Sequence, residues 1–402
     1  MSETQNRGAL AGLRVIEMGS FIAGPFCGQL LADLGADVIK IEPPQVGDVM
    51  RQWGVVQLDG RSLWWPVIAR NKRLITLDLR QPRGQEIARA LIAGADVLVE
   101  NFRPGTLEKW GMGPDDLKRA TPGLIIARVS GFGQTGPYSD KVGFGAVAEA
   151  MGGLRAVAGF PDRPPPRAGL SIGDSLAGMF AAMGVLAALQ ARHASGQGQV
   201  VDVGITDAVL AVQEAILSEY SATGAIRERT GSILPRIAPS NLYPTGDGQW
   251  ILIGGNGDAI FRRLAQAMGQ PELAQDERYA THRARGDHQQ ELDERVADWT
   301  RTLPLTELLA ILEQADVPSG PLNDASGILA DPHFRARGAV VDVQTQDYGR
   351  LTMQGVTPRL SQTPGDIRWA GQPLGTHTRE VLSGVLGLSE HAIHALEADG
   401  II

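Results

Sequence analysis

Short apolar runs alternate with helical segments through the first 150 or so residues, and this alternation constrains the fold more than any other feature of the chain. Residues 13–18 (LRVIEM) predict a buried strand, residues 24–36 a helix closed by glycine, and residues 37–42 (DVIKIE) a second strand ended by prolines. The same strand, helix, strand order recurs at residues 73–102. Such units normally form right-handed crossovers between parallel strands. We therefore predict an α/β fold with a large, doubly wound, Rossmann-like parallel sheet.

The chain changes in character near residue 222, where turn-forming residues replace apolar periodicity. A chain of 402 residues is also longer than one core usually fills. We predict the N-terminal part of a large domain at residues 1–225 and a smaller α+β domain at residues 226–325. Residues 326–402 are expected to return to the large domain.

The composition argues against several classes of partner. Lys and Arg number 37 against 45 Asp and Glu, a net charge of −8, which disfavours a nucleic-acid or anionic-membrane surface. The polar start MSETQNRGALAG has no signal core, and no run of about 18 apolar residues is evident. The single cysteine, Cys27, fits a reducing compartment, so we expect a cytoplasmic protein. The histidines have no metal-ligand spacing, and no metal site is predicted.

One carboxylate, Asp174, stands at the start of a long apolar helix predicted for residues 174–194. The simpler interpretation is that Asp174 is the N-cap of this helix. The functional interpretation is that the helix start also directs free amides and a positive dipole end toward anything bound to the carboxylate. One residue can serve in both ways, so the sequence leaves both interpretations open.

Basic residues follow the ends of predicted strands. Arg80, Arg103 and Lys109 stand just beyond strands, where open α/β sheets bind ligands, and phosphates suit such cations. A glycine turn at residues 252–258 (LIGGNGD) also follows a strand and is either a plain loop or a flexible flap.

Several familiar motifs are absent. The turn GSFIAGP at residues 19–25 lacks the G-x-G-x-x-G spacing and is not followed by G-K-[ST], so a dinucleotide fingerprint and a P-loop are both unsupported. No G-x-S-x-G elbow occurs either.

Ordered motifs between about residues 9 and 390 resemble the class III coenzyme A transferases, the family of formyl-CoA and carnitine-CoA transferases to which 2-methylacyl-CoA racemases are related. They include LRVIEMGSFIAGPFCGQLLADLGADVIKIEPP, NKRLITLDL, DVLVENFRPGTLEKWG, GDSLAGMFAAMGVLAAL and PLGTHTREVL. The resemblance implies that Asp174 is the nucleophile and carries CoA as an aspartyl thioester. A carboxylate with an ordinary pKa of about 3.9 is ionised at neutral pH and needs no base to attack a thioester. Apart from CoA as co-substrate, the resemblance implies no cofactor and no metal.

The resemblance also assigns binding residues. The CoA contacts carried over are Ile22, Ala23, Leu77, Asp78, Leu79, Arg80, Asn101, Phe102, Arg103, Lys109 and Phe144. Apart from the resemblance, we take Arg51 and Arg73 as candidates for holding the acceptor acid, and the amides of the helix start and of the turn at Gly255, Asn256 and Gly257 as candidates for binding the oxyanion.

The expected activity is transfer of CoA from an acyl-CoA, with succinyl-CoA as a candidate donor, to a small organic acid. The resemblance implies a homodimer of two interlocked, ring-like chains. One alternative is an acyl-CoA racemase, but related racemases carry His-Asp where this chain has Phe144-Gly145. A second alternative is a non-catalytic CoA-binding protein in which Asp174 only caps its helix.

Overall fold

The computed structural model describes residues 8–402; residues 1–7, with which the predicted large domain begins, lie outside the described residues. The sequence predicts domain boundaries at 225/226 and 325/326. The structure divides the chain into two compact units. Of the described residues, the first unit comprises 8–154, Ala168–Leu217 and Pro332–Ile402, and the second comprises Arg155–Arg167 and Ser218–Asp331.

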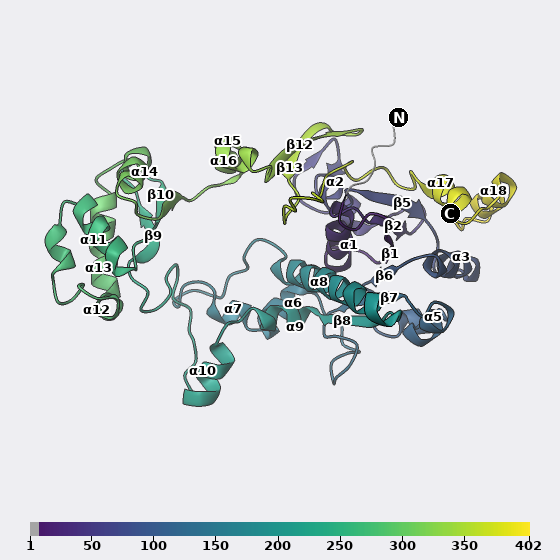
Figure 1. The fold of residues 1–402 in the computed structure, drawn as a ribbon, viewed down its shortest axis with the longest axis horizontal. Coiled ribbons are helices and arrows are strands. Elements are labelled where there is room, and N and C mark those ends of the chain that lie inside the picture. Colours follow the sequence, from purple (N-terminus) through teal and green to yellow (C-terminus); the bar gives the residue numbers. More distant parts are fainter. Residues whose placement is uncertain (1–7) are drawn as a thin grey trace. The chain divides into compact units, whose positions relative to one another are not determined.

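A six-stranded parallel sheet forms the centre of the first unit (Figure 1). Its order is β5-β2-β1-β6-β7-β8, so the chain begins in the middle and builds outward in each direction. This confirms the predicted α/β fold with a parallel sheet. The switch in direction falls between β1 and β6, and open sheets bind ligands beside such a switch. The strands are β1 (Arg14–Met18), β2 (Asp37–Glu42), β5 (Lys72–Thr76), β6 (Val97–Glu100), β7 (Ile125–Ser130) and β8 (Val200–Gly204).

Helices cover both faces of this sheet because successive strand residues point to opposite sides. Val15 and Val38 pack on one face, and Ile16 and Ile39 on the other. The first face is covered by α1 (Ala23–Asp33), α6 (Gly145–Met151), α8 (Ile172–Ser195) and α9 (Ile205–Ala211). The second is covered by α3 (Pro82–Ala93), α5 (Pro114–Ala120), α17 (Thr378–Gly384) and α18 (Glu390–Ala398).

Helix α8 is, by length and composition alone, apolar enough to cross a membrane, although the sequence analysis found no such run. In the structure its small residues Ala177, Ala181 and Val185 are buried in the cluster that also contains sheet residues such as Val99 and Ala127. Another side of α8, which includes Met179 and Met183, is exposed in the structure.

The C-terminal segment completes the first unit. Arg70 donates to the Gln354 carbonyl (2.5 Å), Asn71 donates to the Asp366 carbonyl (2.8 Å), and the Leu74 amide donates to His377 Nδ1 (3.0 Å). The remaining elements of this unit are short: η1 (Val49–Arg51), β3 (Gln57–Leu58), β4 (Arg61–Ser62), α2 (Trp65–Ile68), α4 (Thr106–Lys109), α16 (Pro332–Ala336), β12 (Val340–Thr345) and β13 (Gly349–Gln354).

The second unit contains an antiparallel sheet in the order β11-β10-β9 with a core of its own around Tyr243, Phe261 and Leu308. Its elements are β9 (Ser240–Pro244), β10 (Trp250–Gly254), β11 (Ser319–Pro321), α11 (Asp258–Ala267), η2 (Pro271–Ala274), α12 (His282–Asp287), α13 (Gln289–Thr300), α14 (Leu305–Gln314) and α15 (Ala325–Ala330). Two short helices cross the boundaries between units, α7 (Leu154–Val157) and α10 (Ile216–Thr223).

The close packing of α1 against α8 depends on Gly178. A Cβ at this position would lie 2.8 Å from the Ala23 carbonyl oxygen and 3.0 Å from the Phe26 ring. We therefore expect Gly178→Ala to lower the free energy of unfolding by about 1–3 kcal/mol through overpacking, although alanine favours helices. Chemical denaturation followed by circular dichroism measures this change. Gly384→Ala in α17 is the control, because its Cβ would meet no atom within 4 Å; equal effects of the two variants would contradict the prediction.

Candidate active site

The turn that follows β1 lies at the switch point and is clamped by the residue that follows β6. The side-chain NH2 group of Asn101 donates to the Ser20 carbonyl (2.8 Å), and the side-chain oxygen of Asn101 accepts a hydrogen bond from the backbone N–H of Ser20 (3.0 Å). Gly19 has φ 129°, and a Cβ on it would lie 1.8 Å from that Asn101 oxygen. Glycine is thus required here by both conformation and space.

A pocket of about 170 Å³ opens beside this turn; we call it the Asp174 pocket. Its walls come from the carboxyl ends of β1, β6 and β7 and from the segment before α6, and Asp174 of α8 completes it. The residues that line it besides Asp174 are Phe21, Ala23, Asn101–Pro104, Val129–Gly131, Ser139, Lys141–Phe144 and Ile205. The carboxylate therefore faces a cavity rather than packed hydrocarbon.

Asp174 is not the N-cap of its helix, which corrects the simpler prediction. Residues 172 and 173 are already helical, Ser171 is the N-cap, and Asp174 lies in the first turn of α8. A negative charge in that turn still interacts favourably with the helix dipole.

Glycine at position 145 allows the Asp174 carboxylate to lie against the start of α6. A Cβ on Gly145 would be 2.3 Å from Asp174 Oδ2, so no side chain fits there while the carboxylate keeps this position. Nearby, the Gly173 amide donates to buried Glu149 (3.4 Å), which ties α8 to α6. Where related racemases carry an acid–base pair, this chain therefore offers an apolar ring, Phe144, and a bare backbone.

A second pocket of about 280 Å³ lies on the other side of the switch point; we call it the strand-end pocket. It is formed by the turn after β1, the end of β2 and the residues after β5, with Phe102 and Trp110 opposite. These two rings meet edge to face, with centroids 5.2 Å apart. Phe102 lines both pockets, so the two cavities share this residue.

The residues expected to contact CoA divide between these two pockets, with exceptions. Ala23, Asn101, Phe102, Arg103 and Phe144 line the Asp174 pocket. The strand-end pocket receives Leu77, Asp78, Leu79 and Arg80 together with Phe102. Ile22 is buried at the N-cap of α1, and Lys109 is exposed at the end of α4; neither lines either pocket.

The structure brings neither arginine proposed for the acceptor to the Asp174 pocket. Arg51 donates to both oxygens of Glu42 (2.7 and 2.8 Å), and its guanidinium lies over the Trp65 ring. Arg73 lies near the amino end of β5, opposite the edge where the pocket opens, and donates to Asp37 (2.8 Å). Both were chosen because they stand near strands, but strand direction and local carboxylates decide their positions.

The glycine turn at Gly255, Asn256 and Gly257 belongs to the second unit. Fully buried Arg285 donates to the Asn256 carbonyl (2.7 Å) and to Asp258 (2.7 Å). These bonds fix the turn at its base.

Sequence reasoning missed Lys141, Phe21 and Ser139, which line the Asp174 pocket. The Lys141 ammonium lies 3.6 Å from the Tyr138 ring centroid. Segment 139–143 belongs to LIIARVSGFGQTGPYSDKVGF (residues 124–144), a motif that contributes to the family resemblance, but no residue within the segment was singled out. Gly131 and Gly143 lie in close contact, since a Cβ on Gly131 would be 2.7 Å from Gly143 Cα.

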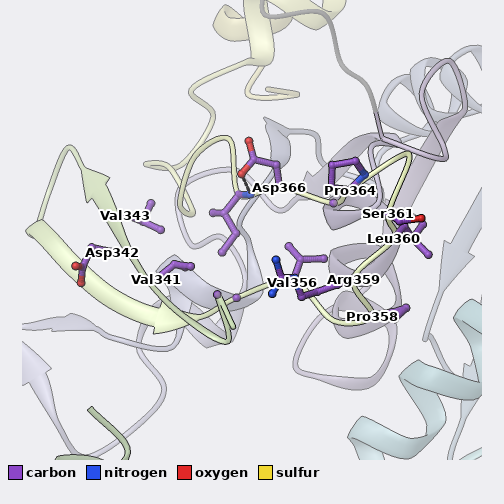
Figure 2. A pocket seen from close by; sticks show the side chains of 14 residues that line it. Val341, Asp342, Val343, Val356, Pro358, Arg359, Leu360, Ser361, Pro364 and Asp366 are labelled. Atoms are coloured by element: carbon purple, nitrogen blue, oxygen red, sulfur yellow. Dashed lines mark hydrogen bonds between the residues drawn. The ribbon is translucent and has the colours of Figure 1, made fainter. Parts of the chain in front are cut away.

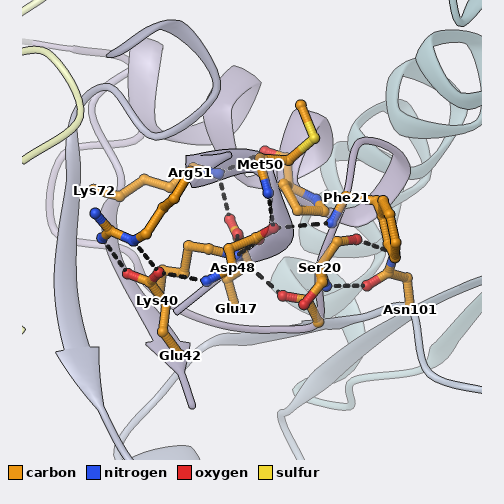
Figure 3. Close-up of polar contacts among 12 residues, drawn as sticks. Glu17, Ser20, Phe21, Lys40, Glu42, Asp48, Met50, Arg51, Lys72 and Asn101 are labelled. Carbon is orange, nitrogen blue, oxygen red and sulfur yellow. Dashed lines mark hydrogen bonds and ion pairs between the residues drawn. The ribbon is translucent and has the colours of Figure 1, made fainter. Parts of the chain in front are cut away.

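A buried ionic network supports the turn after β1 (Figure 3). Lys40 pairs with Glu17 (3.0 Å) and Asp48 (2.8 Å), and Lys72 pairs with Glu17 (2.7 Å). Burial alone would lower the pKa of Lys40, but the carboxylates of Asp48 and Glu17 outweigh burial and raise it. For Lys72, burial dominates and lowers the pKa despite Glu17.

A larger pocket of about 640 Å³ lies between the β12–β13 hairpin and residues 358–367 (Figure 2). Three valines are among its lining residues, and Asp342 of the hairpin is paired with Arg335 (3.2 Å). The pocket holds none of the residues singled out from the sequence. Among residues 8–402, no group of three or more His, Cys, Asp or Glu side chains is arranged as metal ligands.

Comparison with known proteins gives consistent matches. The family model described as CoA-transferase family III matches residues 10–378. Succinyl-CoA–D-citramalate CoA-transferase of Chloroflexus aurantiacus is 57% identical over 402 residues, covering 100% of both chains. The beta subunit of succinyl-CoA–L-malate CoA-transferase of the same organism is 42% identical, covering 98% of both. A crystal structure of a CAIB/BAIF family protein from Brucella suis superposes with a TM-score of 0.83 at 35% identity, covering 94% of this chain and 99% of that one.

Cys27 lies beside the ionic network and should be inert. Burial, reinforced by the Glu17 carboxylate and opposed by Lys72, raises the pKa of its thiol to about 12, whereas an exposed thiol has about 8.5. We expect Ellman's reagent at about pH 8 to label the protein in concentrated urea but not in the native state. Equal labelling rates in the two states would contradict this. Because the native state binds this proton more tightly, the stability from Cys27 is complete below about pH 8.5 and is lost as the pH rises toward 12.

Proposed function

The chain belongs to CoA-transferase family III and is a CoA-transferase, and we propose that it moves CoA from succinyl-CoA to D-citramalate with Asp174 as the covalent carrier. The observation that carries the choice of substrates is the 57% identity, over the full length of both chains, to an enzyme named for that pair. Succinyl-CoA also appears in the name of the relative that is 42% identical, and there the acceptor is L-malate.

The size of the Asp174 pocket supports a small acid. Its volume of about 170 Å³ is below the roughly 300–1,000 Å³ of pockets that enclose drug-sized ligands. Succinate and citramalate are short dicarboxylic acids, and a long acyl chain would exceed this space.

The first half of the proposed reaction loads CoA onto the enzyme. An oxygen of Asp174 attacks the thioester carbon of succinyl-CoA, the carbon–sulfur bond breaks, and CoA thiolate leaves a succinyl–aspartyl anhydride. The thiolate then attacks the Asp174 carbonyl carbon and expels succinate, which leaves CoA on Asp174 as a thioester.

The second half reverses this order with the acceptor. A carboxylate oxygen of D-citramalate attacks the aspartyl thioester, releasing thiolate and forming a citramalyl–aspartyl anhydride. The thiolate attacks the citramalyl carbonyl carbon, which forms citramalyl-CoA and restores the Asp174 carboxylate. The protein supplies the nucleophile and the donors for each oxyanion, and no electrons are exchanged.

Backbone amides are our candidates for the oxyanion donors. The first amides of a helix lack intrahelical partners. At the start of α8, Gly173 already donates to Glu149, so the start of α6 at Gly145, which the carboxylate touches, is the better placed of the two. Donors fixed by backbone geometry need no reorganisation as charge develops.

We assign the nucleotide part of CoA to the strand-end pocket and the reacting thioester to the Asp174 pocket. Arg80 lies at the rim of the strand-end pocket, 82% exposed, and is paired with Asp78 (2.8 Å), so its charge is available to a phosphate from solvent. We also propose an interlocked homodimer, as the family resemblance implies, and a cytoplasmic location for it.

The choice of substrates predicts a ranking of acceptors. With succinyl-CoA as donor, we expect D-citramalate to give a higher kcat/KM than L-citramalate, L-malate, glutarate or oxalate, measured by chromatography of the CoA esters. A preference for L-malate would overturn D-citramalate as the acceptor and leave the transferase class intact.

The role of Asp174 predicts a covalent adduct. Protein incubated with succinyl-CoA and quenched should carry CoA on the peptide that contains residue 174, detected by mass spectrometry. Asp174→Asn should lose both the adduct and turnover, because an amide is not a competent nucleophile. Asp207→Asn, on the neighbouring helix α9 and outside both pockets, is the matched control and should keep both. Turnover of Asp174→Asn at the parental rate would refute the mechanism.

A further inference from the structure

Phe21 has a backbone conformation that a bulky residue rarely adopts. Its φ is 67°, in the left-handed region, where a phenylalanine is strained. Such strain persists only where the surroundings hold it, and it often marks functional sites. Phe21 lines the Asp174 pocket. Its ring packs edge to face against Trp53 (5.8 Å between centroids) and Phe144 (6.0 Å), and Phe144 also lines the pocket.

Asp48 accepts a hydrogen bond from the backbone of Phe21 in this conformation. Its Oδ1 accepts from the Phe21 amide (3.3 Å) and from the Met50 amide (2.9 Å). Its Oδ2 pairs with the Lys40 ammonium at 2.8 Å, and both side chains are 1% exposed (Figure 3). Asp48 itself touches neither the Asp174 pocket nor the strand-end pocket.

Lys40 fixes the other end of the same turn. Its ammonium donates to the Gly19 carbonyl (3.0 Å) and pairs with Glu17 (3.0 Å). The single ammonium therefore restrains Gly19 directly and Phe21 through Asp48. A buried ionic cluster is weak evidence for added stability, since apolar residues often replace such clusters without loss. Its geometric effect here is to hold one turn in one strained shape.

We propose that Asp48 is a positioning residue for the transfer reaction, which acts through Phe21 to fix the pocket wall and so to set the size of the acyl group that Asp174 receives. The inference rests on the proposed function of Asp174, because that assignment makes this pocket the acyl site. When the charge of Asp48 is removed, the Phe21 backbone relaxes, the aromatic wall loosens, and discrimination against a longer acyl group falls.

The test compares succinyl-CoA with glutaryl-CoA, which is one methylene longer, in the full-length protein. One methylene gives at most about 10- to 200-fold discrimination in kcat/KM. We expect Asp48→Asn to reduce the wild-type ratio of kcat/KM for succinyl-CoA over glutaryl-CoA by about tenfold. The matched control is Asp33→Asn, an equally buried carboxylate (2% exposed) that pairs with Arg70 at 2.6 Å and lines neither pocket. It should lower the unfolding midpoint without changing the ratio.

A double variant tests whether Asp48 acts through Phe21. Glycine adopts this φ without strain, so Phe21→Gly should lower the ratio by itself and remove the need for Asp48. Adding Asp48→Asn to Phe21→Gly should then change the ratio by less than about twofold. An equal loss in both backgrounds, or a lower midpoint with an unchanged ratio, would overturn the proposal.

Phe21→Ala keeps the ionic network and removes the ring, so it provides a test even when Asp48→Asn does not fold. The ratio should fall in this variant as well, and an unchanged ratio would overturn the proposal. If the wild-type protein transfers CoA from neither donor, the proposed substrates are wrong. If the wild-type protein transfers CoA but none of these variants changes its selectivity, the proposed role of Asp48 is wrong.

Discussion

Buried charge has to be neutralised locally, and this requirement shapes the protein around its candidate active site. Glu17, Lys40, Asp48 and Lys72 are each at most 1% exposed, so each depends on its neighbours for its charge. Glu17 is on β1, Lys40 on β2 and Lys72 on β5, and together they tie three adjacent strands beneath one turn. The turn in question is the one at which the sheet changes direction, so the ionic cluster and the ligand-binding edge occupy the same part of the fold.

On the helix side of the site, the packing of small residues determines where Asp174 lies, as the ionic cluster holds the turn after β1. Gly178 lets α8 approach α1, and Gly145 lets the first turn of α8 approach α6. The position of Asp174 therefore depends on the absence of a side chain at Gly178 and at Gly145. A side chain at either glycine would push the helix or the carboxylate away, and no attractive contact could restore the arrangement at such short range.

The sequence predicted those parts that follow from local pattern, and it missed those that follow from long-range contact. The parallel strands and the apolar helix that carries Asp174 could be recognised from periodicity, and the family resemblance selected the aspartate. The start of α8 was misplaced by a few residues because Ser171 and Asp174 are equally good caps in isolation, and only the backbone of Ile172 and Gly173 decides between them. Lys141 was not singled out from the sequence, because only the folded structure shows that residues just before α6 line the Asp174 pocket. Arg51 was proposed for the acceptor acid because nothing in its local sequence shows that its guanidinium donates hydrogen bonds to Glu42.

Phe102 has a consequence for how proteins of this shape can diversify. Because this residue lines both pockets, a substitution there is expected to alter the two cavities together. Variation in one cavity alone has to come from residues confined to it, such as Phe21 and Phe144 on one side or Val46 on the other. A substitution that reshapes one pocket and leaves the other unchanged is therefore expected at residues other than Phe102.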